Sequence, residues 1–287
     1  MGHDRSVSPP LVLLAAGLGT RFGGAKQLAP VGPGGEPLFA LTARQALTEG
    51  FGRVLVVTRA ALAHDVEALI SAHLGGGPVE VVLQDGSGPS RDRPWGTAHA
   101  VSVCAPLVDG PIGVGNADDY YGGAAIRALA GAVGGLGPDD AVVVGYRLGD
   151  TLSSNGPVNR ALCRVDGSGR VIGMEECCGL RRRGDVAIDA GGNAHPLDAP
   201  VSMNLLGLGS GVPGRLARRF AAFSAEHAGD LVEMVLPDEL ASLVEEGTLS
   251  VRYLAGGDRW AGLTRRGDLD DLRRVVAGDV APPPVPG

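Results

Sequence analysis

The sequence predicts an α/β fold: a mostly parallel sheet covered by helices on both faces, with antiparallel strands added in the second half. Two observations lead to this prediction. In the first half, five short apolar segments alternate with segments of helical spacing, which is typical of parallel strands joined by crossover helices. After Tyr146 the pattern changes, and two strand-like segments flank Asp166-Gly-Ser-Gly169, a sequence typical of a hairpin turn.

The strands of the first half are expected at the short apolar runs. These are residues 11–16, 53–58, 79–83, 111–114 and 141–146. The helices between them are expected at residues 37–49, 62–73, 96–104 and 124–133. Pro37 suits the first turn of its helix, and Gly50 suits the position just past its end. Because ligands of such sheets bind outside the carboxyl ends of the strands, loops 17–36, 84–97 and 115–122 should share one edge.

The second half is expected to add antiparallel strands to the same sheet rather than to form an independent domain. A hairpin is predicted at residues 161–165 and 171–176, followed by an irregular stretch at 179–199. The remaining elements are a strand at 201–207, helices at 213–227 and 237–247, a strand at 249–254 and a helix at 267–276. The predicted organisation is a single domain over residues 11–276, with halves 11–146 and 147–276, between a polar tail at 1–10 and a proline-rich tail at 277–287.

Composition narrows the classes of function. Hydrophobic residues make up 44% and charged residues 20% of the 287 residues, as in an ordinary globular protein. The net charge of −7 argues against a non-specific nucleic-acid binder. No apolar run approaches the length of a membrane span, and the short polar stretch before Leu11 is not expected to be a signal peptide. The four cysteines lack the spacing of a metal or redox motif, and the scattered histidines predict no zinc site, so a cytoplasmic protein is expected.

A glycine-rich loop follows the first predicted strand and carries two cations. Glycines stand at positions 17, 19, 23 and 24, and Arg21 and Lys26 lie in the same stretch. Glycines let backbone N–H groups crowd around an anion because no Cβ blocks the approach. Lys26 is the only lysine in the chain beside 24 arginines, and its compact charge is not interchangeable with a planar guanidinium at a tight site. The loop is therefore predicted to bind phosphate.

Two familiar phosphate motifs do not fit this loop. A Walker loop ends in Gly-Lys followed by a hydroxyl residue, but Ala25 separates Gly24 from Lys26, and Gln27 takes the hydroxyl position. A dinucleotide fingerprint requires a third glycine where Phe22 stands. An NADP oxidoreductase is disfavoured for this reason.

The loop resembles the signature of the nucleotidyltransferase superfamily that includes the sugar-1-phosphate nucleotidyltransferases (NDP-sugar pyrophosphorylases). The matching stretch is Leu14-Ala-Ala-Gly-Leu-Gly-Thr-Arg-Phe-Gly-Gly-Ala-Lys-Gln-Leu-Ala-Pro-Val-Gly32. Later segments similar to the family are Pro94-Trp-Gly-Thr-Ala-His-Ala-Val101, Gly115-Asn-Ala-Asp-Asp119, Val201-Ser-Met-Asn-Leu-Leu-Gly207 and Asp258-Arg-Trp-Ala-Gly-Leu-Thr264. The resemblance spans most of residues 11–276 and implies a Rossmann-like fold of the nucleotide-diphospho-sugar transferase type.

The resemblance implies Mg²⁺-dependent transfer of a nucleotidyl group from an NTP to a sugar 1-phosphate or similar phosphate acceptor, with release of pyrophosphate. Such an in-line displacement requires positioning and charge neutralisation more than covalent chemistry. The catalytic residues would be Arg21, Lys26 and Asp118; the loop and Arg21 would hold the triphosphate, and Lys26 would lie near the α-phosphate or the acceptor phosphate. The nucleotide-binding residues would be Ala16, Gly17, Leu18, Gly19, Thr20, Gln84, Gly96 and Thr97.

Carboxylates at the same edge of the sheet would hold the metal ion. Asp118 follows the fourth predicted strand, and Mg²⁺ usually takes one or two carboxylates together with phosphate oxygens. Asp258 is the second candidate, by resemblance to related cytidylyltransferases, although Gly256-Gly-Asp258 is also an ordinary turn sequence. Asp119 is expected to be solvated.

The acceptor side departs from the family pattern. The residues that the resemblance places against the acceptor are Gly145, Glu175 or Glu176, and Asn204. The two glutamates point to opposite sides of a strand, so at most one faces the acceptor. Many family members carry a lysine soon after this acid, whereas Cys177-Cys178 follows here. The acceptor phosphate would then meet Arg160 or the run at 181–183, although three successive arginines also suit a solvated face.

Two other functions are left open by the sequence. A GT-A-type glycosyltransferase with an NDP-sugar donor would use Asp118-Asp119 as its metal motif, but a diphosphate donor needs no triphosphate cradle. The other is a non-catalytic nucleotide-sensing module. The expected partners are an NTP and a phosphorylated small-molecule acceptor, with no nucleic acid and no membrane. The nucleobase, the sugar and assembly into a homo-oligomer are left open.

Overall fold

The structure is a computed structural model that describes residues 8–19, 22–256, 259–263 and 265–279. The strands are β1 (Pro10–Leu14), β2 (Arg53–Thr58), β3 (Val79–Leu83), β4 (Ile112–Asn116), β5 (Asp119–Tyr120), β6 (Asp140–Arg147), β7 (Val158–Val165), β8 (Val171–Arg183), β9 (Val186–Ile188), β10 (Ala194–Pro196), β11 (Pro200–Leu208), β12 (Ser250–Ala255) and β13 (Ala261–Gly262). The α-helices are α1 (Leu38–Thr48), α2 (Ala60–Leu74), α3 (Thr97–Ser102), α4 (Gly123–Val133), α5 (Gly211–Glu226), α6 (Leu236–Glu245) and α7 (Leu269–Asp279). Short 3₁₀ turns are η1 (Lys26–Leu28), η2 (Ala105–Leu107), η3 (Leu148–Asp150) and η4 (Arg266–Asp268).

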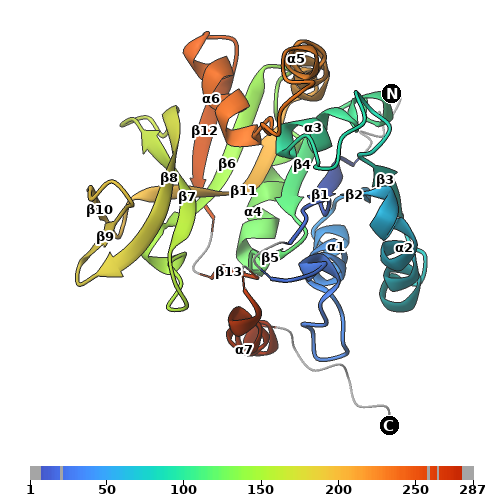
Figure 1. Ribbon diagram of the computed structural model, residues 1–287, viewed down its shortest axis with the longest axis horizontal. Coiled ribbons are helices and arrows are strands. Elements are labelled where there is room, and N and C mark those ends of the chain that lie inside the picture. The colour runs from blue at the N-terminus through green and yellow to red at the C-terminus, as the bar shows by residue number, and fades with distance from the viewer. Residues whose placement is uncertain (1–7, 20–21, 257–258, 264, 280–287) are drawn as a thin grey trace, which may run out of the picture.

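Strand β1 lies in the middle of the parallel part of an eleven-stranded sheet (Figure 1). It pairs in parallel with β2 and β4, and β2 pairs in parallel with β3. Strand β11 runs antiparallel between β4 and β6, and β12 is parallel to β6. The mixed sheet confirms the predicted fold class. The order differs in one respect from a simple alternation, because β11, from late in the chain, separates β4 from β6.

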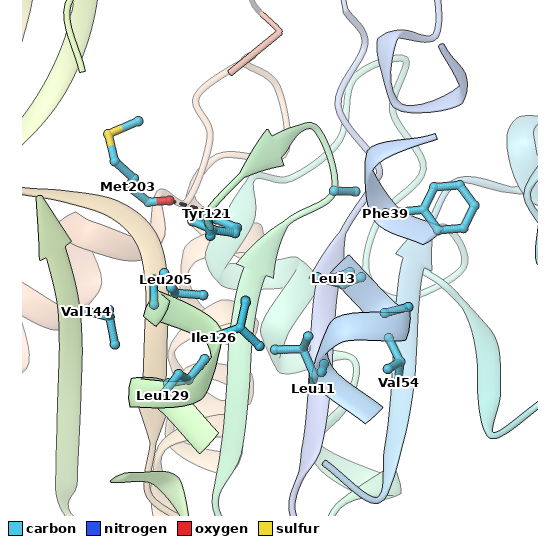
Figure 2. Close-up of a cluster of buried hydrophobic side chains, with 14 of the residues drawn as sticks. Leu11, Leu13, Phe39, Val54, Tyr121, Ile126, Leu129, Val144, Met203 and Leu205 are labelled. Carbon is cyan, nitrogen blue, oxygen red and sulfur yellow. Dashed lines mark hydrogen bonds between the residues drawn. The ribbon is translucent and has the colours of Figure 1, made fainter. Parts of the chain in front are cut away.

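Alternate residues of β1 enter two separate cores, as the period of a strand requires. Leu11 and Leu13 pack with side chains of α1, α2 and α4 on one face of the sheet. Figure 2 shows these two leucines beside Ile126 and Leu129 of α4. Val12 and Leu14 pack with side chains of α3, α5 and α6 on the other face. The sheet is therefore covered on both faces, and β1 delivers the following loop from a fully buried position.

The second half of the chain extends the sheet on the side away from β3. The predicted hairpin is confirmed: β7 pairs antiparallel with β8, and the Asp166 carboxylate accepts backbone hydrogen bonds from Ser168 and Arg170 across the turn. The prediction of an irregular stretch at residues 179–199 is wrong. Strand β8 continues to Arg183, and β9 and β10 pair antiparallel beyond it. Backbone pairing stabilises these strands, and their many glycines and exposed arginines show none of the alternation that predicts a strand.

The small sheet of β5 and β13 was not predicted, because two-residue strands leave no periodic pattern. This sheet pairs residues 261–262 with the segment after β4. Beyond it, Leu272 and Val276 of α7 pack against Leu38 and Leu41 of α1. None of the helices in the described part of the chain has the length and apolarity needed to cross a membrane.

Candidate functional site

A cavity of about 350 Å³ opens beyond the carboxyl ends of β1 and β4. Residues of the glycine-rich loop, the 84–97 segment and the segment after β4 line it, which confirms that the three loops share one edge. The predicted nucleotide-binding residues that line it are Ala16, Gly17, Leu18, Gly19, Gln84, Gly96 and Thr97. Thr20, together with the predicted catalytic residue Arg21, lies outside the described residues.

The glycine-rich loop folds back on Gly19. Gly19 has a φ of +62°, and a Cβ there would overlap the carbonyl of Gly24. Its own carbonyl accepts backbone hydrogen bonds from Phe22 and Gly23, each at 3.0 Å. The Lys26 N–H donates to the Gly24 carbonyl at 2.9 Å, so the loop ends in the 3₁₀ turn η1. A side chain at position 19 is incompatible with this close approach of backbone to backbone.

Gln27 supports the loop from below. Its side chain is buried, and its Nε2 donates to the carbonyls of Ala15 at 2.9 Å and Gly17 at 3.3 Å. Gln27, at the position of the hydroxyl residue in a Walker loop, thus stabilises the start of the glycine-rich loop by hydrogen bonds. The sequence motif identified the position but not this role.

Lys26 and Asp118 both line the cavity and form an ion pair between Nζ and Oδ2. Their side chains are 25% and 18% exposed, so both can reach a ligand. η1 presents the lysine from one loop, and the segment after β4 presents the aspartate from another. Two residues predicted for one site, 92 positions apart in the chain, therefore touch.

Asp119, expected to be solvated, is instead buried, with 6% of its surface exposed. Its Oδ2 accepts a hydrogen bond from Asn116 Nδ2 at 2.8 Å. Burial, and secondly the charge of Asp118, raise the pKa of Asp119 to about 7, while Lys26 and Arg160 act in the opposite direction. The expectation fails because β5, which holds Asp119, pairs with β13 and is covered by it.

A network that the sequence did not predict holds the segment after β4. The hydroxyl of Tyr121 accepts a hydrogen bond from the backbone N–H of Asn116 at 2.7 Å. It donates to the carbonyl of Met203 at 3.0 Å, as Figure 2 shows. Asn204 Nδ2 donates to Asn116 Oδ1 at 3.4 Å. Asn204 has a φ of +59° at an irregularity in β11 next to Ser202, a strained geometry of the kind that accompanies functional sites. Asn116 also belongs to the site, because it lines the cavity together with Asp118.

Gln84, which lines the cavity of about 350 Å³, forms a buried pair with His99. Gln84 Nε2 donates to the Gly96 carbonyl at 2.9 Å and approaches His99 Nδ1 at 3.1 Å. An amide nitrogen is only a donor, so Nδ1 must be the acceptor and the imidazole neutral. Burial lowers the pKa of His99 to about 4, and the charge of Arg91 contributes in the same direction. The amide group of Gln84 is thus held in one orientation.

Gly96 lies against the segment before α6. It has a φ of +103°, and a Cβ there would overlap the Met234 carbonyl. Met234 N–H donates to the Trp95 carbonyl at 2.8 Å, and Thr97 Oγ1 accepts from the Leu236 N–H at 2.9 Å. The sequence did not indicate that residues 233–237 belong to the site, because they contain no recognisable motif. The contact requires glycine at position 96.

A second cavity, of about 250 Å³, adjoins the first. Both cavities share the lining residues Lys26, Thr97, Asn116, Asp118 and Asn204. Of the predicted acceptor residues, Glu176 and Asn204 line the second cavity. Among the described residues that line it, Glu175 and Gly145 are not found, and a Cβ on Gly145 would overlap the Tyr253 ring that packs against it.

Arg160 is a cation of the second cavity, and its side chain is almost fully buried. Its guanidinium donates to the carbonyls of Thr151 at 3.1 Å and Asn159 at 2.7 Å and lies over the Trp260 ring at 4.7 Å. Burial lowers the pKa of Arg160 to about 10, so it remains charged at neutral pH. The alternative cations at residues 181–183 are exposed at the far end of β8 and do not line the cavity.

The residues at the wall between the cavities fit a hard divalent cation. Asp118 offers a carboxylate that is partly exposed, and Asn116 and Asn204 place side-chain amides on the same wall. Oxygen ligands of this kind are those that Mg²⁺ prefers. Asp258, the predicted second carboxylate, lies outside the described residues.

A larger cavity, of about 890 Å³, lies at the opposite edge of the sheet, where β6 and β12 begin. Two of its arginines are paired with acids: Arg215 bonds Asp139, and Arg219 Nη1 lies 3.1 Å from Glu239 Oε2. None of the residues of the glycine-rich loop is among the described residues that line this cavity.

Comparisons with known proteins give a domain match for the first half of the chain and similar folds for nearly all of it. Residues 11–147 match the family model of the MobA-like NTP transferase domain. The fold is similar to that of a Bacillus anthracis protein assigned as a glucose-1-phosphate thymidylyltransferase and solved in complex with sucrose, with a TM-score of 0.66, 16% identity and coverage of 96% of this chain and 97% of that chain. It is also similar to HddC from Yersinia pseudotuberculosis, with a TM-score of 0.59, 14% identity and coverage of 93% and 99%. No curated protein sequence matches the chain.

Proposed function

We propose that the chain transfers a nucleotidyl group from an NTP to a sugar 1-phosphate or a similar phosphorylated acceptor, a proposal that the match of residues 11–147 to the MobA-like NTP transferase domain supports. One observation carries the proposal: two adjoining cavities meet at Lys26 and Asp118. The cavity of about 350 Å³ has a glycine-rich wall for a triphosphate. The smaller one has a buried cation for an acceptor phosphate. A reaction that joins two phosphorylated substrates requires two such compartments.

In this proposal the NTP occupies the cavity of about 350 Å³, which the glycine-rich loop lines. Backbone N–H groups of the glycine-rich loop face the triphosphate, and Arg21 adds charge to the same loop. These groups stabilise the negative charge that builds up on the departing pyrophosphate. Gln84 and the backbone around Gly96 lie at the far wall, where a base edge can be recognised by hydrogen bonds.

Lys26 offsets the repulsion between the two substrates. An oxygen of the acceptor phosphate attacks the α-phosphorus of the NTP, the bond to the β-phosphate oxygen breaks, and pyrophosphate leaves with its electron pair. Both partners are anions, so their approach needs a cation between them. Lys26 lines both cavities and is positioned for this role once a ligand displaces it from Asp118.

Asp118, with amide oxygens from Asn116 or Asn204, would hold Mg²⁺ on this wall. Bound there, Mg²⁺ would neutralise charge on the phosphate oxygens. Asp258 stays a proposed second ligand.

The acceptor occupies the smaller cavity. Arg160 replaces the lysine that many relatives carry after the acid of β8, and its buried, pre-oriented guanidinium suits a phosphate. Glu176 and Asn204 line the same space and can bind sugar hydroxyls, since a carboxylate accepts and an amide both donates and accepts. The Bacillus anthracis protein of similar fold is assigned as a glucose-1-phosphate thymidylyltransferase, which supports a sugar phosphate as the acceptor.

A pyrophosphate-release assay tests the proposal. The purified chain is mixed with Mg²⁺, each NTP in turn and a panel of sugar 1-phosphates. Release that requires both substrates supports the proposal. Hydrolysis or transfer of a nucleotide sugar, without release from any pair, would favour the glycosyltransferase. Tight NTP binding with no turnover in any combination would favour a sensing module.

A further inference from the structure

Cys177, Asp189 and His195 meet outside the proposed catalytic site. Cys177 lies on β8, Asp189 just after β9, and His195 on β10, in the part of the sheet at the left of Figure 1. One potential ligand atom of each residue lies within 4.8 Å of the other two, and His195 Nε2 is 2.9 Å from Asp189 Oδ2. Antiparallel pairing of β8, β9 and β10 creates this cluster from residues that are up to 18 positions apart.

The donor set suits zinc. A thiolate, an imidazole and a carboxylate are the three ligand types that Zn²⁺ binds, and its tetrahedral sites place ligand atoms about 3.5 Å apart. The cluster reaches that spacing with side-chain adjustments of about 1 Å, since its ligand atoms all lie within 4.8 Å of one another. A thiol in the set disfavours Mg²⁺ and Ca²⁺, which take oxygen ligands. One thiolate and one carboxylate would neutralise the ion.

A neighbouring residue fixes the carboxylate in place. Asn193 donates to Asp189 through its backbone N–H at 2.8 Å to Oδ1 and through Nδ2 at 3.0 Å to Oδ2. Such outer hydrogen bonds orient the ligands of protein metal sites. Gly179 has a φ of +71°, and a Cβ there would come within 2.9 Å of Ala190, so the bend in β8 lets the β9–β10 hairpin close over Cys177.

The cluster of Cys177, Asp189 and His195 is mostly buried but reaches solvent on the side of the histidine. Cys177 is 8% exposed, whereas the side chains of Asp189 and His195 are 11% and 20% exposed. Three ligands come from the protein, and the partly exposed side of the histidine allows a water molecule to complete a tetrahedron. Access from solvent provides an entry path, which a proposed metal site requires.

We propose that Cys177, Asp189 and His195 bind one Zn²⁺ ion, which fastens the β9–β10 hairpin to β8. Binding releases the thiol proton of Cys177 to solvent. Cys177 is paired in register with Arg160 on β7, and Glu176 beside it lines the acceptor cavity. The ion therefore orders the strand that carries the proposed acceptor wall, without touching substrate. Binding of the ion does not require the proposed reaction to occur, so the two can be tested separately.

Zinc binding to protein without a histidine tag tests the proposal. Competition with a chromogenic chelator should give one Zn²⁺ per chain, and Co²⁺ should produce a thiolate-to-cobalt charge-transfer band. Cys177→Ser should abolish the band, and His195→Gln should weaken zinc binding by more than the roughly 10–100-fold that loss of an outer hydrogen bond causes. Cys178→Ser is the matched control, because the neighbouring thiol is exposed and lies outside the cluster. It should bind zinc as the unmodified chain does.

The glutamine variant separates a metal ligand from a hydrogen-bonding residue. Its amide can still donate to Asp189, so a purely structural Asp–His pair would survive this change. Zinc should raise the midpoint of thermal unfolding of the unmodified chain and of Cys178→Ser but not of His195→Gln. Equal zinc binding by His195→Gln, or no bound zinc and no cobalt band in the unmodified folded chain, would overturn the proposal.

Discussion

Gly96→Ala is predicted to impair both the stability of the chain and its binding of NTP. Gly96 has a φ of +103° and a ψ of 179°, a region that only glycine occupies easily. A non-glycine residue there costs about 1–3 kcal/mol in backbone strain. The added Cβ would also come within 2.8 Å of the Met234 nitrogen and overlap its carbonyl, and such overpacking typically costs a further 1–3 kcal/mol.

Gly50→Ala is the matched control. Gly50 has a φ of +105°, but a Cβ there would meet no atom within 4 Å. This variant should therefore lose only the strain contribution, about 1–3 kcal/mol in the free energy of unfolding. Gly96→Ala should lose more, by roughly 1–3 kcal/mol. Urea denaturation of both variants measures the difference.

The functional effect should be specific to Gly96. Relief of the overlap moves the Met234 segment, whose neighbour Glu233 lines the nucleotide cavity. We expect KM for NTP to rise about tenfold or more, the factor that ~1.4 kcal/mol corresponds to. KM of the Gly50→Ala variant should be unchanged. If the two variants show equal stability and equal KM, the contact between Gly96 and the Met234 segment does not shape the site.

Three other predictions concern single side chains. Lys26→Ala and Asp118→Asn should each lower kcat/KM at least about a hundredfold, as loss of a transition-state charge partner does; Lys26→Arg is the sharper probe, and unmodified activity there would mean that the compact lysine charge is not required. Arg160→Gln should raise KM for the acceptor roughly 10–100-fold, the value of a charge-assisted hydrogen bond, and leave KM for NTP unchanged; an equal effect on both constants would contradict an acceptor role. His99 is neutral in the fold because its pKa is lowered to about 4, so its stabilising effect is complete above pH 6.5 and is lost as the pH falls towards 4. Between pH 7 and pH 4.5 the unmodified chain should lose about 2 kcal/mol of unfolding free energy through His99, and His99→Gln should not show this part of the loss. Urea denaturation of both proteins at the two pH values measures the difference, and an equal loss in both would contradict a neutral His99.

Most of the parallel sheet and its ligand edge could be predicted from the sequence. The runs at 53–58 and 79–83 coincide with β2 and β3. β2 is buried on both faces, which makes its sequence continuously apolar, whereas β3 lies at the edge of the sheet and buries only Val79. Three loops that follow strands were expected at one edge, and Lys26 indeed touches Asp118 there. The direction of parallel strands decides this placement, so no knowledge of side-chain packing is needed.

The features that the sequence did not predict depend on pairing between distant segments. Asp119 is buried because β13, about 140 positions later, covers it. Asn116 joins the site through hydrogen bonds to Tyr121 and Asn204, and no short motif encodes that network. The spacing of Cys177, Asp189 and His195 along the sequence likewise matches no metal-ligand motif. These residues meet only through the pairing of β8, β9 and β10.

The fate of the α-phosphorus tests the central claim most directly. The chain is incubated with Mg²⁺, a sugar 1-phosphate and NTP labelled at either the α- or the γ-phosphorus, and the products are separated. Nucleotidyl transfer predicts that the α-label appears in a nucleotide sugar and the γ-label in pyrophosphate, in equal amounts and only when the acceptor is present. Appearance of the γ-label on the acceptor, or release of pyrophosphate without it, would contradict the account.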